Sequence, residues 1–292
     1  MFEKYNALVN EPMSAHTTLK LGGPADYLVF PGSAEEIAAL FAEAQAAHLP
    51  VTVIGHGSNL LVLDGGIRGL VISIGKNMRK TALQGNVITA QAGAMLGSVA
   101  AEAAAAGLSG LEFASGIPGT VGGGITMNAG AYGGEMAQAV TRVKGICPDG
   151  NTVEFSCEEM NFGYRHSVVS EKGFIVTEAE FTLQEGDPGE IRARMSELNA
   201  RRAEKQPLDM PSAGSTFKRP DGYYAAALID QCGLKGYCVG GAQVSLKHAG
   251  FLVNTGTSSS DFLELMRKVQ QIVEERAGVK LEPEIKILGV AV

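Results

Sequence analysis

Glycine gathers in two short segments of this chain, and their clustering restricts the possible folds strongly. The first segment, at 55–62, reads GHGSNLLV, and the second, at 115–134, reads SGIPGTVGGGITMNAGAYGG. Glycine loses more conformational freedom on folding than any other residue, so long glycine-rich segments are costly to order. We therefore expect both segments to bind a ligand through backbone N–H groups, and we expect the second to hold little regular structure.

The first segment matches neither common nucleotide-binding pattern. It begins like the dinucleotide fingerprint G-x-G-x-x-G, but Leu60 occupies the place of the third glycine and no acidic residue lies near 75–78. A P-loop motif is absent from the sequence as well. Two interpretations remain for this segment: a nest of N–H groups around an anion, or a tight turn with Asn59 in a left-handed conformation. Together with the second segment, it favours a dinucleotide held by a fold other than the Rossmann fold.

Hydrophobic periodicity predicts a mixed fold of class α+β. Ser33 and Glu36 form a capping-box pattern ahead of a helix whose apolar stripe is Ile37, Leu40, Phe41 and Ala44. Further helices are predicted at 96–107, 188–207, 225–232 and 259–277. Strands are predicted at 17–21, 27–30, 50–55, 69–74, 86–92, 174–183, 251–256 and 279–289, with a hairpin at 139–156 that turns at 148–150.

The amphipathic helix that begins at Pro188 marks a change in the character of the sequence. We therefore predict two domains, at 1–187 and 188–292, each within the usual size of a domain. The last strand, at 280–292, is expected to return to the first domain or to the active site.

Composition excludes several classes of protein. The formal net charge is −7, so no global basic surface for nucleic acid is expected. No apolar run is long enough for a membrane span, and the first residues do not read as a signal peptide. The cysteines Cys147, Cys157, Cys232 and Cys238 form no C-x-x-C pair, which predicts a reduced cytoplasmic protein without a metal site.

Ser215 and Lys218 stand at the spacing Ser-x-x-Lys, which is typical of β-lactamases and penicillin-binding proteins. Those enzymes also need the tripeptides Ser-Asp-Asn and Lys-Thr-Gly, and neither occurs in this sequence. The match is therefore weak evidence for a serine nucleophile.

Six segments in a fixed order carry a more specific resemblance. They are HTTLKLGGPADYLVFP, GHGSNLLV, GIPGTVGGGITMNAGAYGGE, YRHS, PSAGSTFKRP and LEPEIKILG. Together they resemble the UDP-N-acetylenolpyruvoylglucosamine reductase family of bacterial peptidoglycan synthesis. The resemblance extends from His16 to Gly289, and YRHS with PSAGSTFK is similar to the shorter type II branch of that family.

The resemblance implies a fold, a cofactor and a reaction. The fold would be a two-part FAD-binding domain of the vanillyl-alcohol-oxidase/PCMH type, followed by a C-terminal α+β substrate-binding domain. The cofactor would be noncovalent FAD, reduced by NADPH. The reaction would reduce UDP-N-acetylglucosamine enolpyruvate to UDP-N-acetylmuramate, with hydride passing from flavin N5 to C3 and a proton to C2. We expect a monomer whose partner is a UDP-sugar and not a nucleic acid.

The resemblance also assigns roles to individual residues. Arg165 would stabilise the enolate that forms, Ser215 would protonate C2, and Glu284 matches the catalytic glutamate of the family. Tyr164, Lys205 and Arg219 would contact the substrate, although Arg219 stands where other members have asparagine. The residues expected to bind FAD are Gly55, His56, Gly57, Ser58, Asn59, Leu60, Gly116, Ile117, Pro118, Gly119, Thr120, Gly122, Gly123, Asn128, Gly130 and Ala131.

Three alternatives remain open at this point. The first is another FAD-dependent oxidoreductase of the same fold, such as an alcohol oxidase. The second is an acyl-transferring hydrolase of the Ser-x-x-Lys class, and the third is a nucleotide-binding module without catalysis. A yellow purified protein would separate the flavoenzyme hypotheses from the other two.

Overall fold

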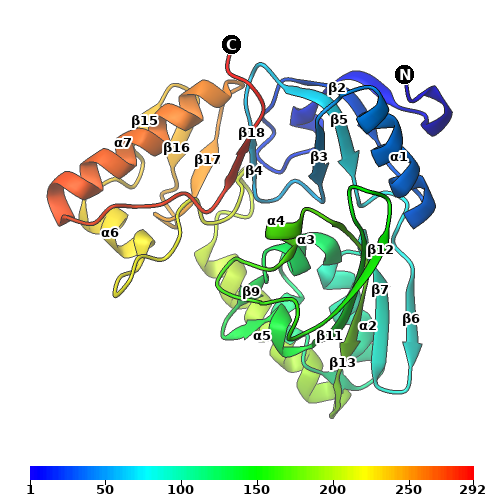
Figure 1. Cartoon of the computed structure of the whole chain (residues 1–292). Helices are drawn as coiled ribbons and strands as arrows, with labels where there is room; N and C mark the ends of the chain where they lie inside the picture. The colour runs from blue at the N-terminus through cyan, green and yellow to red at the C-terminus, as the bar shows by residue number, and fades with distance from the viewer. The chain divides into compact units, whose positions relative to one another are not determined.

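The computed structural model describes all 292 residues and divides into two compact units. The first unit comprises Met1–Leu8, Tyr27–His56 and Gly69–Arg202, and the second comprises Val9–Asp26, Gly57–Arg68 and Ala203–Val292. Figure 1 shows the helices and strands of both. The predicted domain boundary at 187/188 stays a prediction.

The first unit is built around an antiparallel sheet of five strands in the order β12-β11-β13-β7-β6. Its strands are β6 (Thr81–Gln84), β7 (Val87–Gln91), β11 (Val140–Ile146), β12 (Thr152–Ser156) and β13 (Ile175–Thr182). The predicted hairpin at 139–156 is confirmed as β11 and β12, with Gly150 in the left-handed region at the turn (φ 83°).

A second sheet has the order β1-β2-β5-β3. It consists of β1 (Leu8–Pro12), β2 (Pro24–Val29), β3 (Val51–Ile54) and β5 (Ile67–Ser73). Strands β3 and β5 run parallel and are joined in register from Val51 with Leu70 to Ile54 with Ser73. The glycine segment at 55–62 therefore begins at the carboxyl end of a parallel strand.

Helix α1 (Ala34–Ala46) forms as the sequence predicts. Ser33 is its N-cap, and the Ser33 side chain accepts a hydrogen bond from the Glu36 backbone N–H at 3.2 Å. The predicted apolar stripe is the buried face of the helix. The other helices of the first unit are α2 (Leu96–Ala105), α3 (Val121–Thr126), α4 (Val169–Lys172) and α5 (Pro188–Lys205), the last of which continues past Arg202 into the second unit.

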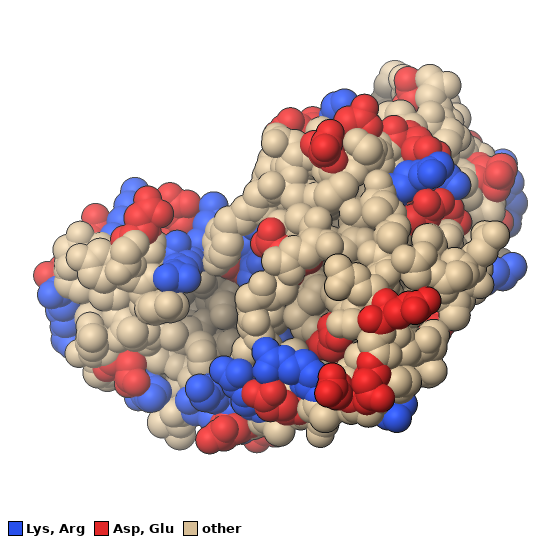
Figure 2. All heavy atoms as spheres, turned by 90° about the horizontal axis from the view of Figure 1, so that it is seen from below, with Lys and Arg blue, Asp and Glu red and all other residues tan.

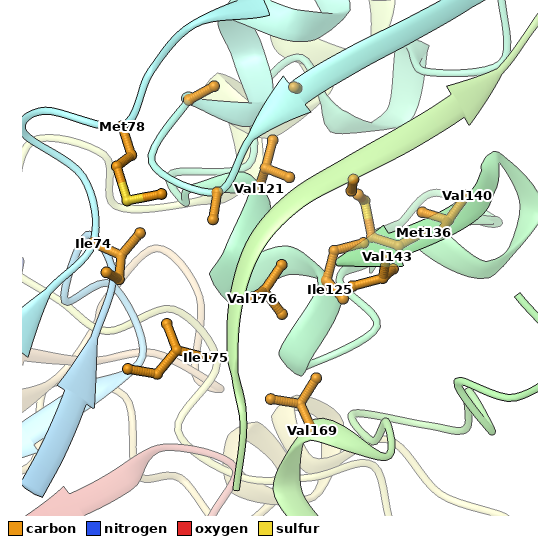
Figure 3. Packing of buried hydrophobic residues seen from close by; sticks show 14 of the residues in the cluster. Ile74, Met78, Val121, Ile125, Met136, Val140, Val143, Val169, Ile175 and Val176 are labelled. Carbon is orange, nitrogen blue, oxygen red and sulfur yellow. The ribbon is translucent and has the colours of Figure 1, made fainter. Parts of the chain in front are cut away.

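The core of the first unit lies between the five-stranded sheet and the helices beside it. In Figure 3, Val121 and Ile125 of α3 point toward the side of β13 that carries Val176, and Val143 of β11 lies nearby. Since α3 is held by these buried side chains, the glycine segment that contains it has a fixed place against the sheet.

The second unit packs around the long helix α7 (Ser259–Ala277), whose buried face includes Phe262, Leu265, Met266, Val269 and Val273. Helix α6 (Ala225–Gln231) and a small antiparallel sheet of β15 (Cys238–Val239), β16 (Ala242–Val244) and β17 (Leu252–Asn254) complete this core. The last strand, β18 (Lys286–Leu288), runs parallel to β4 (Leu60–Val62).

Short elements complete the structure. Two further strand pairs are β8 (Leu108–Ser109) with β14 (Gln184–Glu185), and β9 (Gly130–Ala131) with β10 (Gly134–Glu135). Four 3₁₀ turns occur at Glu3–Tyr5, Met13–Ala15, Glu112–Ala114 and Met136–Gln138.

Two local predictions were wrong. The alternating residues at 17–21 form no strand: Thr17 Oγ1 donates to the Leu21 carbonyl at 2.9 Å, and Lys20 adopts a left-handed conformation (φ 57°), so this stretch is a turn. The second glycine segment also contains a helix, α3, where little regular structure was expected.

Charged side chains of both signs are interspersed on the face shown in Figure 2. Several lie in ion pairs, including Lys144 with Glu178 at 3.0 Å and Arg142 with Glu154 at 3.1 Å. None of the helices combines the length and the apolar character that crossing a membrane requires.

Candidate active site

In the second unit, three segments far apart in sequence are joined by hydrogen bonds of the backbone and of one side-chain amide. Asn59 Nδ2 donates to the Glu284 carbonyl at 3.3 Å, and the Lys286 N–H donates to the Asn59 carbonyl at 2.9 Å. The Glu284 N–H donates to the Thr216 carbonyl at 2.8 Å. The predicted cofactor loop and two predicted catalytic positions, Ser215 and Glu284, therefore lie side by side.

Gly57 can only be glycine in this arrangement. Its backbone is left-handed (φ 72°), and a Cβ atom there would overlap the carbonyl oxygen of His16. Thr18 fixes the loop from the same side: its N–H donates to the Gly57 carbonyl at 3.2 Å, and its Oγ1 donates to the Ser212 carbonyl at 2.6 Å. Thr18 thus connects the loop at 55–62 with the segment that carries Ser215.

Ser215 is exposed, while its neighbour Thr216 is buried. The Thr216 N–H donates to the Gly250 carbonyl at 2.9 Å, and Thr216 Oγ1 accepts from the Leu252 N–H at 3.2 Å. Thr216 therefore anchors the segment, and this presents the Ser215 hydroxyl at the surface of the unit. Lys218 Nζ lies 3.2 Å from a carboxylate oxygen of Glu282, so the lysine of the Ser-x-x-Lys pattern is engaged in an ion pair.

In the first unit, Arg165 lies at the tip of a tight turn. Gly163 and His166 exchange backbone hydrogen bonds at 3.1 and 3.2 Å, and Arg165 between them is left-handed (φ 54°). Arg165 Nη2 donates to the Gly130 carbonyl at 3.4 Å, and its guanidinium lies 5.0 Å from the centre of the Tyr164 ring. The turn holds the predicted catalytic arginine against the second glycine segment.

Asn128 links the same two segments. Its Nδ2 donates to the Gly163 carbonyl at 3.1 Å, its Oδ1 accepts from the Ala137 N–H at 3.0 Å, and only 1% of its surface is exposed. Its backbone is also left-handed (φ 40°). Because the amide is used at both ends within the protein, Asn128 orders the loop, and its predicted contact with FAD stays a prediction.

Close contacts within the protein explain why glycine occupies three positions of the two glycine segments. A Cβ at Gly122 would lie 3.0 Å from the Ala92 Cβ, and one at Gly124 would lie 3.0 Å from Leu96 Cδ1. A Cβ at Gly55 would lie 2.6 Å from Thr120 Oγ1, so the two glycine segments approach each other there. Close packing accounts for these three glycines.

The residues of the first unit fit a ligand with an anionic group. Arg202 is 8% exposed, and its Nε has no hydrogen-bond partner. The guanidinium lies against Gly116 of the second glycine segment, where a Cβ would be 2.9 Å from Nε. A buried, unpaired cation beside a predicted cofactor loop fits the phosphates of FAD.

The other predicted contacts have the following places. Lys205 is the exposed last residue of α5, and Arg219 is exposed with its guanidinium 4.2 Å from the centre of the Tyr224 ring. His56 is the second residue of the first glycine segment and is exposed. The remaining predicted FAD contacts, Ser58, Leu60, Ile117, Pro118, Gly119, Gly123 and Ala131, lie in the two glycine segments, and the site as a whole stays a prediction.

Sequence reasoning missed two side chains. His248 lies beside the Ser215 segment, and its Nδ1 accepts from the Gly250 N–H at 3.2 Å. Burial lowers the pKa of His248, and the charges of Lys235 and Lys205 lower it further, which favours the neutral imidazole. The other is Arg202: it lies four residues after Leu198 on the buried face of α5, which also includes Ile191, whereas its neighbour Arg201 is exposed. The helical period of this apolar stripe is the signal that could have singled out Arg202.

Comparison with known proteins gives consistent matches over the chain. Residues 25–156 match a family described as an FAD binding domain, and residues 206–288 match the C-terminal domain of UDP-N-acetylenolpyruvoylglucosamine reductase. The chain is 52% identical to the UDP-N-acetylenolpyruvoylglucosamine reductase of Agathobacter rectalis, over 97% of this chain and 94% of that protein. It is 51% identical to that of Caldanaerobacter subterraneus, over 96% and 93%.

A solved structure also matches. The crystal structure of UDP-N-acetylenolpyruvylglucosamine reductase from Thermus caldophilus is similar with a TM-score of 0.83 and 41% identity. The match covers 95% of this chain and 97% of that one. The predicted architecture, an FAD-binding domain followed by a substrate-binding domain of this type, is confirmed.

Proposed function

The chain belongs to the UDP-N-acetylenolpyruvoylglucosamine reductase family of flavin-dependent oxidoreductases, and from this we propose its reaction in detail. The enzyme reduces the enolpyruvyl ether of UDP-N-acetylglucosamine to UDP-N-acetylmuramate, with noncovalent FAD as its cofactor and NADPH as the reductant. NADPH is oxidised to NADP⁺, and the double bond between C2 and C3 gains one hydride and one proton.

One observation carries this proposal. Asn59 of the cofactor loop, Glu284 and the Ser215–Thr216 segment belong to one hydrogen-bonded network of the second unit, with Asn59 bonded to the Glu284 carbonyl and Glu284 bonded to Thr216. The proposed reaction needs a redox cofactor close to a proton donor and to a carboxyl group, and this network brings the segments that carry them together.

FAD, when bound, supplies the hydride that reaches C3. The protein must then stabilise the negative charge that develops at C2 and its carboxylate, because groups aimed at developing charge give the largest catalytic effect. Arg165 suits this task, since a guanidinium can donate two parallel hydrogen bonds to a carboxylate. The narrow turn at 163–166 and the bond to the Gly130 carbonyl limit its freedom, which favours preorganisation.

Ser215 gives the proton to C2. A hydroxyl is a weak acid, but the enolate is a strong base, and this drives the transfer. Because Ser215 is exposed, solvent can return the proton after each turnover. Glu284, next in the network, helps to hold the enolate.

Lys205 binds the diphosphate of the substrate. It is exposed at the carboxyl end of α5 in the second unit, so its ammonium group is accessible to a phosphate group of a ligand. Arg219 and Tyr224 form an exposed cation–π pair that could contact the sugar nucleotide in place of the asparagine of other members.

The proposal is tested in two half-reactions without oxygen. NADPH should bleach the yellow flavin, and the enolpyruvyl sugar nucleotide should then restore the colour while UDP-N-acetylmuramate forms. Bleached enzyme that is recoloured by oxygen but not by this substrate would instead support another oxidoreductase of the same fold.

A further inference from the structure

Arg202 is a buried charge for which the protein supplies no counter-charge. The residue is 8% exposed, and its Nε has no hydrogen-bond partner. Burial lowers the pKa of Arg202, and the nearby Tyr132 offsets this only in part. An arginine nevertheless stays charged in proteins, so the first unit holds an uncompensated cation. Such a charge is strongly unfavourable unless something pairs with it.

The Arg202 side chain lies close to residues from both ends of the second glycine segment. At one end, a Cβ on Gly116 would lie 2.9 Å from Arg202 Nε and 2.5 Å from Asn199 Oδ1. At the other end, the Arg202 guanidinium lies 5.8 Å from the centre of the Tyr132 ring. Ser115 Oγ donates to Asn199 Oδ1 at 3.3 Å, so Asn199 of α5 is held beside the arginine. All these residues belong to the first unit, and Gly116 and Tyr132 lie within the part that matches the FAD binding domain.

We propose that Arg202 is an FAD-binding residue that pairs with an anionic group of the cofactor. The proposal rests on the proposed function, since it takes FAD as the ligand of the first unit. Two groups of FAD share the required chemistry: the pyrophosphate, which is always anionic, and the N1–C2=O edge of the flavin ring, which is anionic when the flavin is reduced. In the first case Arg202 sets the affinity for FAD, and in the second it favours the reduced form and raises the midpoint potential.

Arg201 provides a matched control. It stands next to Arg202 on α5 and lies 5.1 Å from the centre of the same Tyr132 ring. Its side chain is 45% exposed, however, and it lies 3.6 Å from a carboxylate oxygen of Glu197. Arg201→Met thus removes the same charge from the same helix without removing a buried, unpaired cation.

The first measurement is the dissociation constant of FAD, by titrating the apoprotein and following flavin fluorescence. If Arg202 pairs with the pyrophosphate, Arg202→Met should weaken FAD and ADP binding by a similar factor of about 10- to 100-fold, the usual effect of losing a charged hydrogen bond. If it pairs with the reduced ring, ADP binding should not change, and the midpoint potential should fall by about 30 mV for each tenfold loss of preference for reduced FAD. Arg201→Met should change each quantity less than threefold, or about 15 mV in the potential.

A second measurement separates cofactor binding from a structural role. The melting temperature of the Arg202→Met apoprotein should equal or exceed that of wild type, because a buried charge without a partner has been removed. The rise in melting temperature on adding FAD should be smaller than in wild type. If Arg202→Met does not fold, Arg202→Lys serves in its place: it keeps the charge, loses the fork, and should show a smaller change in the same direction.

The outcomes are distinct. If Arg202→Met, like the control Arg201→Met, binds FAD and ADP as wild type does and keeps the wild-type midpoint potential, the role of Arg202 is refuted while the proposed function stands. If wild type itself binds no FAD, the proposed function fails first. Weakened binding of NADPH or of the sugar nucleotide alone, with normal FAD binding and potential, would also overturn this assignment.

Discussion

Replacing Asp64 should destabilise the second unit in a pH-dependent manner. Its carboxylate accepts hydrogen bonds from the Ser259 N–H at 2.8 Å, the Ser258 hydroxyl at 3.0 Å and the Ser260 N–H at 3.3 Å. These groups form the N-terminus of α7, the helix around which that unit packs. The N-terminus of a helix carries a partial positive charge, so the carboxylate acts as a cap supplied from 195 residues away in sequence.

The magnitude follows from what each variant removes. Loss of a capping side chain costs about 1 kcal/mol, and loss of a carboxylate near a helix N-terminus costs about 0.3–1 kcal/mol more. Asp64→Ala should therefore lower the free energy of unfolding by about 1.3–2 kcal/mol, and Asp64→Asn, which keeps one acceptor oxygen, by about 1 kcal/mol. For a chain of this size each kcal/mol lowers the melting temperature by about 2–4 °C.

The sign of the pH effect is fixed by the pKa of Asp64. Burial raises this pKa, but the hydrogen bonds from Ser259, Ser258 and Ser260 outweigh it, and the pKa lies below its ordinary value of 3.8. A lowered folded-state pKa contributes stability that is fully present above the unfolded-state value and is lost as the pH falls through the folded-state value. The difference between wild type and Asp64→Asn should be constant from pH 7 to about pH 5 and should shrink below about pH 4.

The assay is urea unfolding of the full chain at several pH values. Asp209→Asn is the control, because Asp209 is an exposed residue of the same unit and its replacement changes the net charge equally. A difference for Asp64→Asn that is absent at pH 7, or that stays constant down to pH 3, would refute the capping argument.

Three further predictions concern the site. FAD should be released by acid precipitation, and flavin that stays with the precipitate would contradict noncovalent binding. Arg165→Lys should lose most of its turnover while its flavin content stays normal, since lysine keeps the charge but lacks the two-pronged donor; full activity would remove Arg165 from the enolate site. Lys205→Ala should raise KM for the sugar nucleotide more than it lowers kcat, as expected for a uniform binding contact, and steady-state kinetics with an unchanged KM would leave Lys205 without that role.

Local patterns in the sequence predicted local structure well. The stripe at Ile37, Leu40, Phe41 and Ala44 is the buried face of α1, because helical periodicity depends only on neighbours in sequence. Alternation at 17–21 failed because Leu19 and Leu21 are buried within a turn closed by the Thr17 hydroxyl. Both a turn and a strand can alternate in burial, so the pattern alone does not separate them.

The second glycine segment shows where tertiary packing overrides propensity. Gly122 and Gly124 are poor helix formers, yet they lie in α3. Glycine is needed at both positions because a side chain there would press on Ala92 or Leu96. The residues next to them in sequence do not predict those contacts. The partners of Asp64 and Arg202 also belong to segments distant in the chain. For that reason the sequence predicted the loops of the site but not what these two charges contact.

The last prediction concerns Ser215, whose spacing to Lys218 resembles that of an acylating serine. Lys218 lies in an exposed ion pair with Glu282, and Thr216, not Ser215, carries the hydrogen bonds that anchor the segment. If Ser215 only protonates C2, it takes no part in the reduction of the flavin by NADPH. Ser215→Ala should therefore bleach at a nearly normal rate.

Reoxidation by the sugar nucleotide is the step that should fail in Ser215→Ala. The loss should be at least about 10²–10⁴-fold, the usual contribution of general acid catalysis, and stopped-flow absorbance of the flavin measures both steps. Ser215→Cys should recover part of the rate, since a thiol can still donate a proton, and Lys218→Ala should change it little, because no base is needed to activate an attacking hydroxyl. Normal reoxidation in Ser215→Ala, or a covalent β-lactam adduct at Ser215 in wild type, would show that this serine is not the proton donor.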